Sequence, residues 1–260
     1  MFSSASFAFT APSALIGMPT APLELAKRLA ARAAVDEYVR TGMSLGIGSG
    51  STIVYGIQRL AERVHGEERL QVRCVPTSFQ SRQLCGAAGL QVCDLSPACP
   101  SLDVAIDGAD EVDGALDCIK GGGGCQTLEK IVAAAAATFV VVTDYSKRSE
   151  RLLTVWRKGV PVEVLALALT PVEAALRAMG GSPVLRMGAP AKAGPAVTDN
   201  GNLLLDVDFG GGAGLPMEAA ALHAAIKGLP GVLETGIFPG MAKAVIYGEK
   251  DGTITHVKRA

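Results

Sequence analysis

Short apolar segments alternate with segments of helical spacing between residues 23 and 143, and this alternation restricts the fold more than any other feature. We expect strands at residues 43–47, 70–75, 90–94, 102–106 and 139–143, and helices at residues 23–40, 53–64, 78–88 and 128–137. Strands that alternate with helices favour a parallel sheet with helices on its faces. The sequence therefore predicts an α/β protein built around a Rossmann-like parallel sheet.

The pattern changes after residue 153. We expect strands at residues 160–165, 183–186, 203–207 and 231–238, and helices at residues 171–179 and 217–227. The resulting β-α-β-β-α-β order is ferredoxin-like. A hairpin of residues 244–247 and 253–257 follows, and its strands are free to return to the first sheet.

Three parts are therefore predicted. Residues 23–152 plus 240–260 form the Rossmann-like catalytic domain, and residues 153–239 form a smaller ferredoxin-like α+β domain. Residues 1–22 carry no charged side chain and are rich in serine. Organelle presequences usually contain arginine, which this segment lacks, so we interpret it as a disordered tail or a degenerate presequence.

Residues 103–130 carry the strongest chemical signal, because one predicted strand ends in carboxylates. Asp107 and Asp110 follow the strand, and Lys120, four glycines and Glu129 come next. In open α/β sheets ligands bind outside the carboxyl ends of the strands. Unhindered glycine N–H groups can face an oxyanion, and a carboxylate beyond them can act as a general base. The alternative is an acidic turn with a flexible linker, since Asp and Gly are ordinary turn residues.

A second candidate loop lies at residues 46–52, between a predicted strand and a predicted helix. This arrangement offers free N–H groups and the positive end of a helix dipole to an anion. Ser51 stands where the third glycine of a dinucleotide fingerprint would fall, and no Gly-Lys-Ser/Thr of a Walker A loop occurs. The loop therefore favours a small phosphate monoester over a nucleotide, the alternative being a tight turn with an N-cap serine.

Composition argues against several other classes of function. The net charge of −1 and the aromatic content of 5% disfavour a nucleic-acid surface. No apolar run reaches the ~20 residues that cross a bilayer. The sequence contains no CxxC pair and its three histidines are far apart, so we expect no metal site. Cys74 and Cys93 fall in apolar runs, as reduced thiols of an intracellular protein do.

Five motifs, taken in order, resemble the type A family of ribose-5-phosphate isomerases. They are residues 48–52 (GSGST), 107–111 (DGADE), 120–123 (KGGG), 129–131 (EKI) and 144–147 (DYSK). The likeness continues through residues 197–202 and 228–232, so it covers nearly the whole chain from residue 23. It implies a metal-free and coenzyme-free interconversion of ribose 5-phosphate and ribulose 5-phosphate, in the pentose phosphate pathway or the Calvin cycle.

The resemblance also assigns roles to residues. Glu129 would move a proton between C1 and C2 of the sugar through an enediolate, and Asp107, Asp110 and Lys120 would bind hydroxyls and assist ring opening. The remaining substrate-binding residues would be Ser49, Gly50, Ser51 and Thr52 around the phosphate, Lys147 converging on the ligand, Gly108 and Ala109 in the aspartate loop, and Gly121, Gly122 and Gly123 as backbone donors. The smaller domain would act as a lid, and the chain would form a homodimer or homotetramer.

Residues 124–128 (GCQTL) depart from the alanine-rich, arginine-containing run that the family usually has before its glutamate. Cys125 beside the site is either redox-sensitive or a buried inert thiol. The expected location is the cytoplasm, or the plastid stroma if residues 1–22 are a presequence. The alternative function is a non-catalytic sugar-phosphate sensor, but residues 1–22 are too short and uncharged for the DNA-binding helices of such regulators. An acyl-transfer enzyme would need a Gly-x-Ser-x-Gly elbow, which is absent.

Overall fold

The computed structural model describes residues 21–188 and 192–259. The tail or presequence predicted at residues 1–22 lies outside this part of the chain except for its last two residues. Within the described residues, no helix is both long and apolar enough to cross a membrane.

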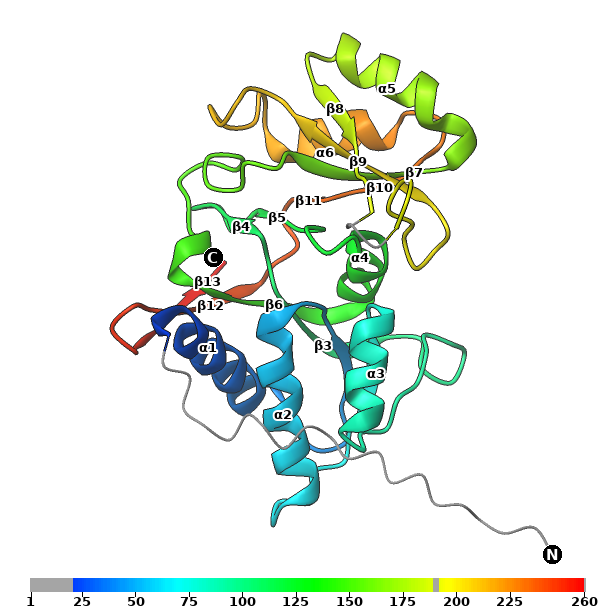
Figure 1. Ribbon diagram of the computed structural model, residues 1–260. Helices are drawn as coiled ribbons and strands as arrows, with labels where there is room; N and C mark the ends of the chain where they lie inside the picture. The colour runs from blue at the N-terminus through cyan, green and yellow to red at the C-terminus, as the bar shows by residue number, and fades with distance from the viewer. Residues whose placement is uncertain (1–20, 189–191, 260) are drawn as a thin grey trace, which may run out of the picture.

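A six-stranded sheet crosses the middle of the molecule, with helices below it in the view of Figure 1, and its strand order is β13-β12-β6-β3-β1-β2. Its strands are β1 (Ser44–Ile47), β2 (Arg73–Pro76), β3 (Leu102–Asp107), β6 (Ala136–Asp144), β12 (Ala244–Gly248) and β13 (Ile254–Lys258). All neighbours are parallel except β12 and β13, the predicted hairpin, which joins the sheet beside β6. The predicted parallel sheet is therefore confirmed.

Helices cover both faces of this sheet. The helices α1 (Pro22–Tyr38), α2 (Ser51–His65) and α3 (Phe79–Ala87) bury their apolar side chains in one core, while α4 (Gln126–Ala134) contributes to a core on the opposite face. Because α4 lies between this sheet and the rest of the molecule (Figure 1), its residues face other structural elements on several sides.

A four-stranded antiparallel sheet, in the order β10-β7-β9-β8, forms the other end of the molecule (Figure 1). It consists of β7 (Val160–Val164), β8 (Ser182–Leu185), β9 (Leu203–Asp208) and β10 (Val232–Thr235), with α5 (Leu169–Ala178) and α6 (Ala219–Lys227) packed in one core with it. The element order is the predicted ferredoxin-like one. The domain boundaries at residues 153 and 239 stay a prediction.

A third sheet, which the sequence did not predict, joins the two larger sheets. It contains β4 (Glu111–Val112), β5 (Cys118–Ile119) and β11 (Ile237–Phe238). The single strand predicted at residues 231–238 is wrong, because the chain changes sheets at Gly236. The Lys120 N–H donates to the Gly236 carbonyl at 2.8 Å, and a Cβ at position 236 would lie 2.2 Å from the Lys120 carbonyl oxygen. Only glycine fits this approach.

Other boundaries also differ from the prediction. The strand expected at residues 90–94 is reduced to one isolated bridge between Cys74 and Val92, so the sheet ends at β2. The helix expected at residues 128–137 begins at Gln126 instead and ends at Ala134. Glu129 therefore lies in the first turn of α4, close to the glycine run.

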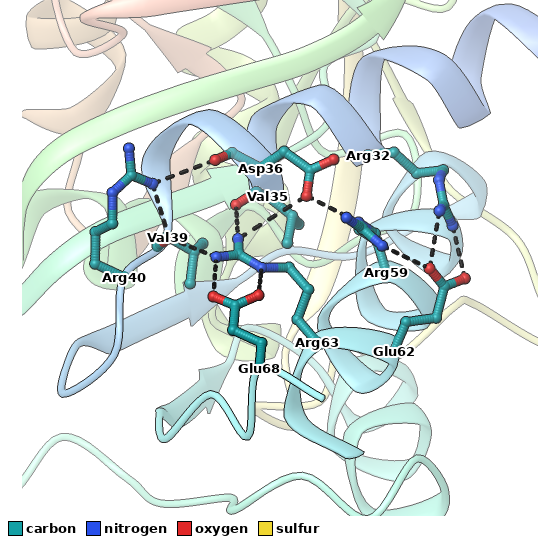
Figure 2. Close-up of polar contacts among 9 residues, drawn as sticks. All are labelled: Arg32, Val35, Asp36, Val39, Arg40, Arg59, Glu62, Arg63 and Glu68. Carbon is teal, nitrogen blue, oxygen red and sulfur yellow. Dashed lines mark hydrogen bonds and ion pairs between the residues drawn. The ribbon is translucent and has the colours of Figure 1, made fainter. Parts of the chain in front are cut away.

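Ion pairs of Arg32 with Glu62 and of Asp36 with Arg59 connect α1 to α2 (Figure 2). The Arg63 guanidinium is 9% exposed and donates to the carbonyls of Val35 at 2.6 Å and Val39 at 3.2 Å. It also pairs with Glu68 at 2.6 Å. The Val35 carbonyl also accepts the Val39 N–H at 3.2 Å, and the Val39 carbonyl also accepts from Arg40 Nη1 at 2.9 Å, so Arg63 adds a second donor at each carbonyl near the C-terminal end of α1.

We expect Arg63→Met to lower the free energy of unfolding by about 1–3 kcal/mol, because it removes the hydrogen bonds that a mostly buried, charged guanidinium makes to two carbonyls. Arg59→Met is the matched control, since Arg59 pairs only with Asp36 and Glu62 at a half-exposed surface and such pairs contribute at most ~1 kcal/mol. Urea denaturation of both variants measures the difference. Equal losses would contradict the special role of Arg63.

Candidate active site

A cavity of about 200 Å³ opens at the carboxyl ends of β1, β3 and β6. Its lining includes all of the predicted site residues except Asp107, namely Ser49, Gly50, Ser51, Thr52, Gly108, Ala109, Asp110, Lys120, Gly121, Gly122, Gly123, Glu129 and Lys147. Asp107 lies directly behind this lining, in contact with Lys120. The predicted segments, separated by up to 98 positions in sequence from residue 49 to residue 147, thus meet where α/β sheets bind their ligands.

The centre of the site is a buried ammonium between two carboxylates. Lys120 Nζ lies 2.9 Å from Asp107 Oδ2 and 3.2 Å from Glu129 Oε2, and it donates to the Gly108 carbonyl. The three residues are 2%, 2% and 6% exposed. Asp107 ends β3, Lys120 follows β5 and Glu129 lies in the first turn of α4, so three elements must be in place before the charges meet.

The charge balance of this triad determines which group exchanges a proton. Two carboxylates and one ammonium leave a net negative charge when all are ionised. Burial, reinforced by the charge of Asp107, raises the pKa of Glu129 to about 8, although Lys120 opposes the shift. Burial disfavours the charged form of Lys120, but Asp107 and Glu129 outweigh it and raise the Lys120 pKa. Lys120 therefore stays charged, and Glu129 is the group with a pKa suited to a general base near neutral pH.

Asp107 also ties the first loop to the end of β3. Its Oδ1 accepts the N–H groups of Ser49 at 3.0 Å and Gly108 at 2.7 Å. A Cβ at Gly48 would lie 1.9 Å from that same oxygen, so the glycine makes room for the carboxylate. The next glycine, Gly50, has φ +93°, which other residues rarely adopt. The small residues of this loop, which are predicted to bind an anion, thus also leave space for the Asp107 carboxylate and donate to it.

Two donors of the predicted anion-binding turn have partners within the protein. The Ser49 hydroxyl bonds to Thr77 Oγ1 at 2.8 Å and Ser78 Oγ at 2.7 Å. The Gly50 N–H donates to Gln80 Oε1 at 2.9 Å. Both residues still line the cavity, but their donors have protein partners. Ser51 and Thr52, the first residues of α2, hold the helix N-terminus at the cavity.

Lys27 on α1 lines the cavity and was missed by the sequence analysis. Its Nζ lies 3.3 Å from Ser51 Oγ and 2.7 Å from Glu24 Oε1. Lys27 stands among several basic residues of an ordinary helix, and no local motif distinguishes it. Thr143 and Asp144, at the end of β6, also line the cavity without having been predicted as site residues.

The aspartate and glycine loops are bonded to each other. Asp110 Oδ2 accepts the Gly122 N–H at 2.7 Å, and burial raises the pKa of Asp110. A Cβ at Gly122 would lie 2.6 Å from Asp110 Oδ1 and 2.8 Å from the Trp156 ring. Lys147 Nζ lies 5.8 Å from the centroid of that ring, and Lys147 also lines the cavity.

The unusual run at residues 124–128 includes Cys125, which directly precedes α4, and Thr127 in the first turn of this helix. Burial raises the pKa of Cys125 to about 12, so the thiol is protonated near neutral pH and the inert interpretation is favoured over redox sensitivity. The Thr127 hydroxyl donates to Glu163, a fully buried residue of β7. Glu163 Oε1 also accepts from Thr198 at 2.7 Å and Asn202 at 2.9 Å. The motif at residues 197–202 is therefore linked to α4 through the carboxylate of Glu163.

Within residues 21–188 and 192–259, no group of three or more His, Cys, Asp or Glu side chains is arranged to hold a metal ion.

Comparisons with known proteins identify the relatives of this chain. The family model described as ribose 5-phosphate isomerase A (phosphoriboisomerase A) matches residues 73–252. The ribose-5-phosphate isomerase of Homo sapiens is 51% identical over 232 residues, which cover 89% of this chain and 72% of the human one. That of Schizosaccharomyces pombe is 48% identical over 242 residues, which cover 92% of this chain and 85% of its own.

Two solved structures are also similar. Ribose 5-phosphate isomerase A of Methanocaldococcus jannaschii superposes with a TM-score of 0.81 at 40% identity, covering 89% of this chain and 97% of that one. A D-ribose-5-phosphate isomerase in complex with phospho-erythronic acid gives a TM-score of 0.85 at 34% identity, covering 91% of this chain and 99% of that one.

Gln126 offers a test of the local packing around α4. Its side chain is fully buried against Gly121, and neither amide atom has a hydrogen-bond partner among the described residues. We expect Gln126→Met to raise the free energy of unfolding by about 1–3 kcal/mol, because it removes an unsatisfied buried amide at similar volume. Urea denaturation measures the change, with exposed Gln91→Met as the neutral control. A loss of stability in Gln126→Met would show that the amide is bonded in the folded protein.

Proposed function

The chain belongs to the ribose 5-phosphate isomerase A family, and from this premise we propose how its residues catalyse the reaction. The protein is an aldose–ketose isomerase that interconverts ribose 5-phosphate and ribulose 5-phosphate. The observation that carries the proposal is the buried contact of Glu129 with Lys120 at the wall of the cavity. The homodimer or homotetramer and the cytoplasmic or plastid location stay predictions.

We propose that Glu129 is the proton shuttle. Isomerisation removes a proton from one of two adjacent carbons and returns it to the other, through an enediolate. One carboxylate can serve both positions because the carbons are a single bond apart. Glu129 suits this task because its burial, with 6% of the residue exposed, raises its pKa and makes its carboxylate a stronger base than an exposed glutamate.

Lys120 is assigned to the oxygen that gains negative charge in the enediolate. Its ammonium is buried, and a charge acts more strongly where water is excluded. Asp107 holds the ammonium in place through its ion pair. Asp110 faces the cavity and is assigned to a sugar hydroxyl, where it assists ring opening by taking or returning the hydroxyl proton.

The phosphate is assigned to the N-terminus of α2, with Ser51, Thr52 and the ammonium groups of Lys27 and Lys147. A helix N-terminus presents N–H groups and a positive dipole to an anion. The phosphate takes no part in the chemistry, but its binding fixes the sugar relative to Glu129. A substrate without phosphate should therefore lose turnover as well as affinity.

The alternative, a sensor that binds a sugar phosphate without converting it, is not favoured. Binding alone requires the phosphate turn and hydroxyl acceptors. It does not require a glutamate whose ionised form is destabilised by burial, since maintaining such a group costs stability. The relatives that match most of the chain are named as isomerases.

We expect Glu129→Gln to lower kcat by about 10²–10⁴-fold, the usual size of a general-base contribution, because the amide keeps the shape and removes the base. Ketose formation from ribose 5-phosphate, followed with a chelator present, measures the loss. Exposed Glu67→Gln is the control and should match the wild type. Retention of more than about a tenth of the wild-type kcat by Glu129→Gln would contradict the shuttle role.

The pH dependence of kcat/KM tests the same residue in the unmodified protein. A base must be ionised in the free enzyme, and the Glu129 pKa is raised from 4.5 to about 8. We therefore expect kcat/KM to increase as pH rises from 6.5 and to level off above a midpoint near 8. The substrate phosphate ionises near pH 6, so its limb lies lower. A flat profile between pH 6.5 and 9 would contradict a base with a raised pKa.

A further inference from the structure

Arg186 connects the four-stranded sheet to the glycine loop of the active site. It directly follows β8, and its guanidinium forms a two-pronged pair with Asp206 on β9, with Nε–Oδ2 at 2.8 Å and Nη2–Oδ1 at 2.5 Å. Its remaining nitrogen, Nη1, donates to the carbonyl of Gly121 at 3.0 Å and to that of Gly122 at 3.3 Å. Arg186 is thus anchored to the four-stranded sheet through Asp206. It also bonds to the glycine loop, which follows β5 of the three-stranded sheet.

Peptide geometry determines what these two contacts do. A trans peptide is planar, and its C=O and N–H point in opposite directions. The Gly121 carbonyl faces Arg186, and the N–H on the other side of that peptide, from Gly122, donates to Asp110 Oδ2 at 2.7 Å. This single peptide therefore lies between a guanidinium and the carboxylate of Asp110.

The next peptide follows the same rule. Because the Gly122 carbonyl faces Arg186, the Gly123 N–H points away from Arg186. Gly123 lines the cavity, and its N–H has no acceptor among the described residues. The Gly122 N–H therefore donates to Asp110, and the Gly123 N–H is available to a ligand.

We propose that Arg186 is a positioning residue for the isomerisation, because it orients two consecutive peptides of the glycine loop toward Asp110 and the substrate. The inference rests on the proposed function, since it assumes the roles given to Asp110 and to the loop. Arginine suits this position because its planar fork reaches a carboxylate and the carbonyls at the same time. A lysine keeps the charge but lacks that geometry.

The competing interpretation is that Arg186 only fastens the two sheets together. In that case its replacement lowers stability and leaves turnover unchanged. If Arg186 instead orients the loop, its replacement lowers kcat, because hydrogen bonds made in the transition state lose their alignment. The phosphate is assigned to the N-terminus of α2, which Arg186 does not contact, so we expect its binding to be unaffected.

The test compares Arg186→Lys and Arg186→Met with the wild type, using kcat and KM for ribose 5-phosphate and the inhibition constant of inorganic phosphate. We expect kcat to fall at least about tenfold in Arg186→Met, and less in Arg186→Lys, with the inhibition constant of phosphate unchanged. Arg177→Met is the control. Arg177 belongs to the same sheet-and-helix unit and pairs only with Glu173 on the surface of α5, so its kcat should match the wild type.

Wild-type kcat in both Arg186 variants overturns the inference, and so does a loss of kcat accompanied by an equal loss of phosphate binding, which indicates general distortion. If Arg186→Met does not fold, Arg186→Lys and Asp206→Asn decide the question by the same criteria, since Asp206→Asn releases the guanidinium from its support. Absence of turnover in the wild-type protein contradicts the proposed function itself, and the inference falls with it. Turnover in the wild type with unchanged variants overturns the inference alone.

Discussion

The ammonium of Lys120 between the carboxylates of Asp107 and Glu129 is the contact on which the rest of the structure depends. Burying these charges is unfavourable unless their geometry is well matched. Each of the three comes from a different element, so the ends of β3 and β5 and the start of α4 must approach to within hydrogen-bond distance. The three sheets together make that approach possible.

Glycines at two positions allow this close approach of the backbone. At Gly48 the chain passes so near Asp107 that no side chain fits, and at Gly236 the Lys120 backbone likewise leaves no space for a side chain. The second contact explains why one predicted strand is divided between two sheets. A continuous strand through residues 231–238 would leave the backbone of Lys120 without the Gly236 carbonyl that accepts its N–H.

The sequence predicted those parts of the fold and site that depend on local patterns. Alternating apolar segments predicted the parallel sheet, and the short motifs predicted which loops would meet at the cavity. The two-residue strands β4, β5 and β11 carry too little periodicity to be recognised. Lys27, Trp156 and Arg186 reach the site from elements with unremarkable local sequence, so only the tertiary fold reveals them. Ser49 shows that a motif does not specify the partners of a hydroxyl, because the Ser49 hydroxyl bonds to Thr77 and Ser78 within the protein.

Three buried glutamates show why only one of them is suited to act as a base. Glu111 is fully buried and accepts four backbone N–H groups, from Leu153 through Trp156, so its carboxylate is occupied in holding a turn. Glu163 is equally buried and accepts from hydroxyl and amide groups of the loop behind α4. Glu129 has no such set of donors. Its Oε2 lacks an aligned hydrogen bond among the described residues, and its main partner is the ammonium at 3.2 Å. A carboxylate that is buried but poorly satisfied is the one that gains by taking a proton. The same residue type is therefore structural at two positions and suited to exchange a proton at the third, and the difference lies in the hydrogen-bond donors around it.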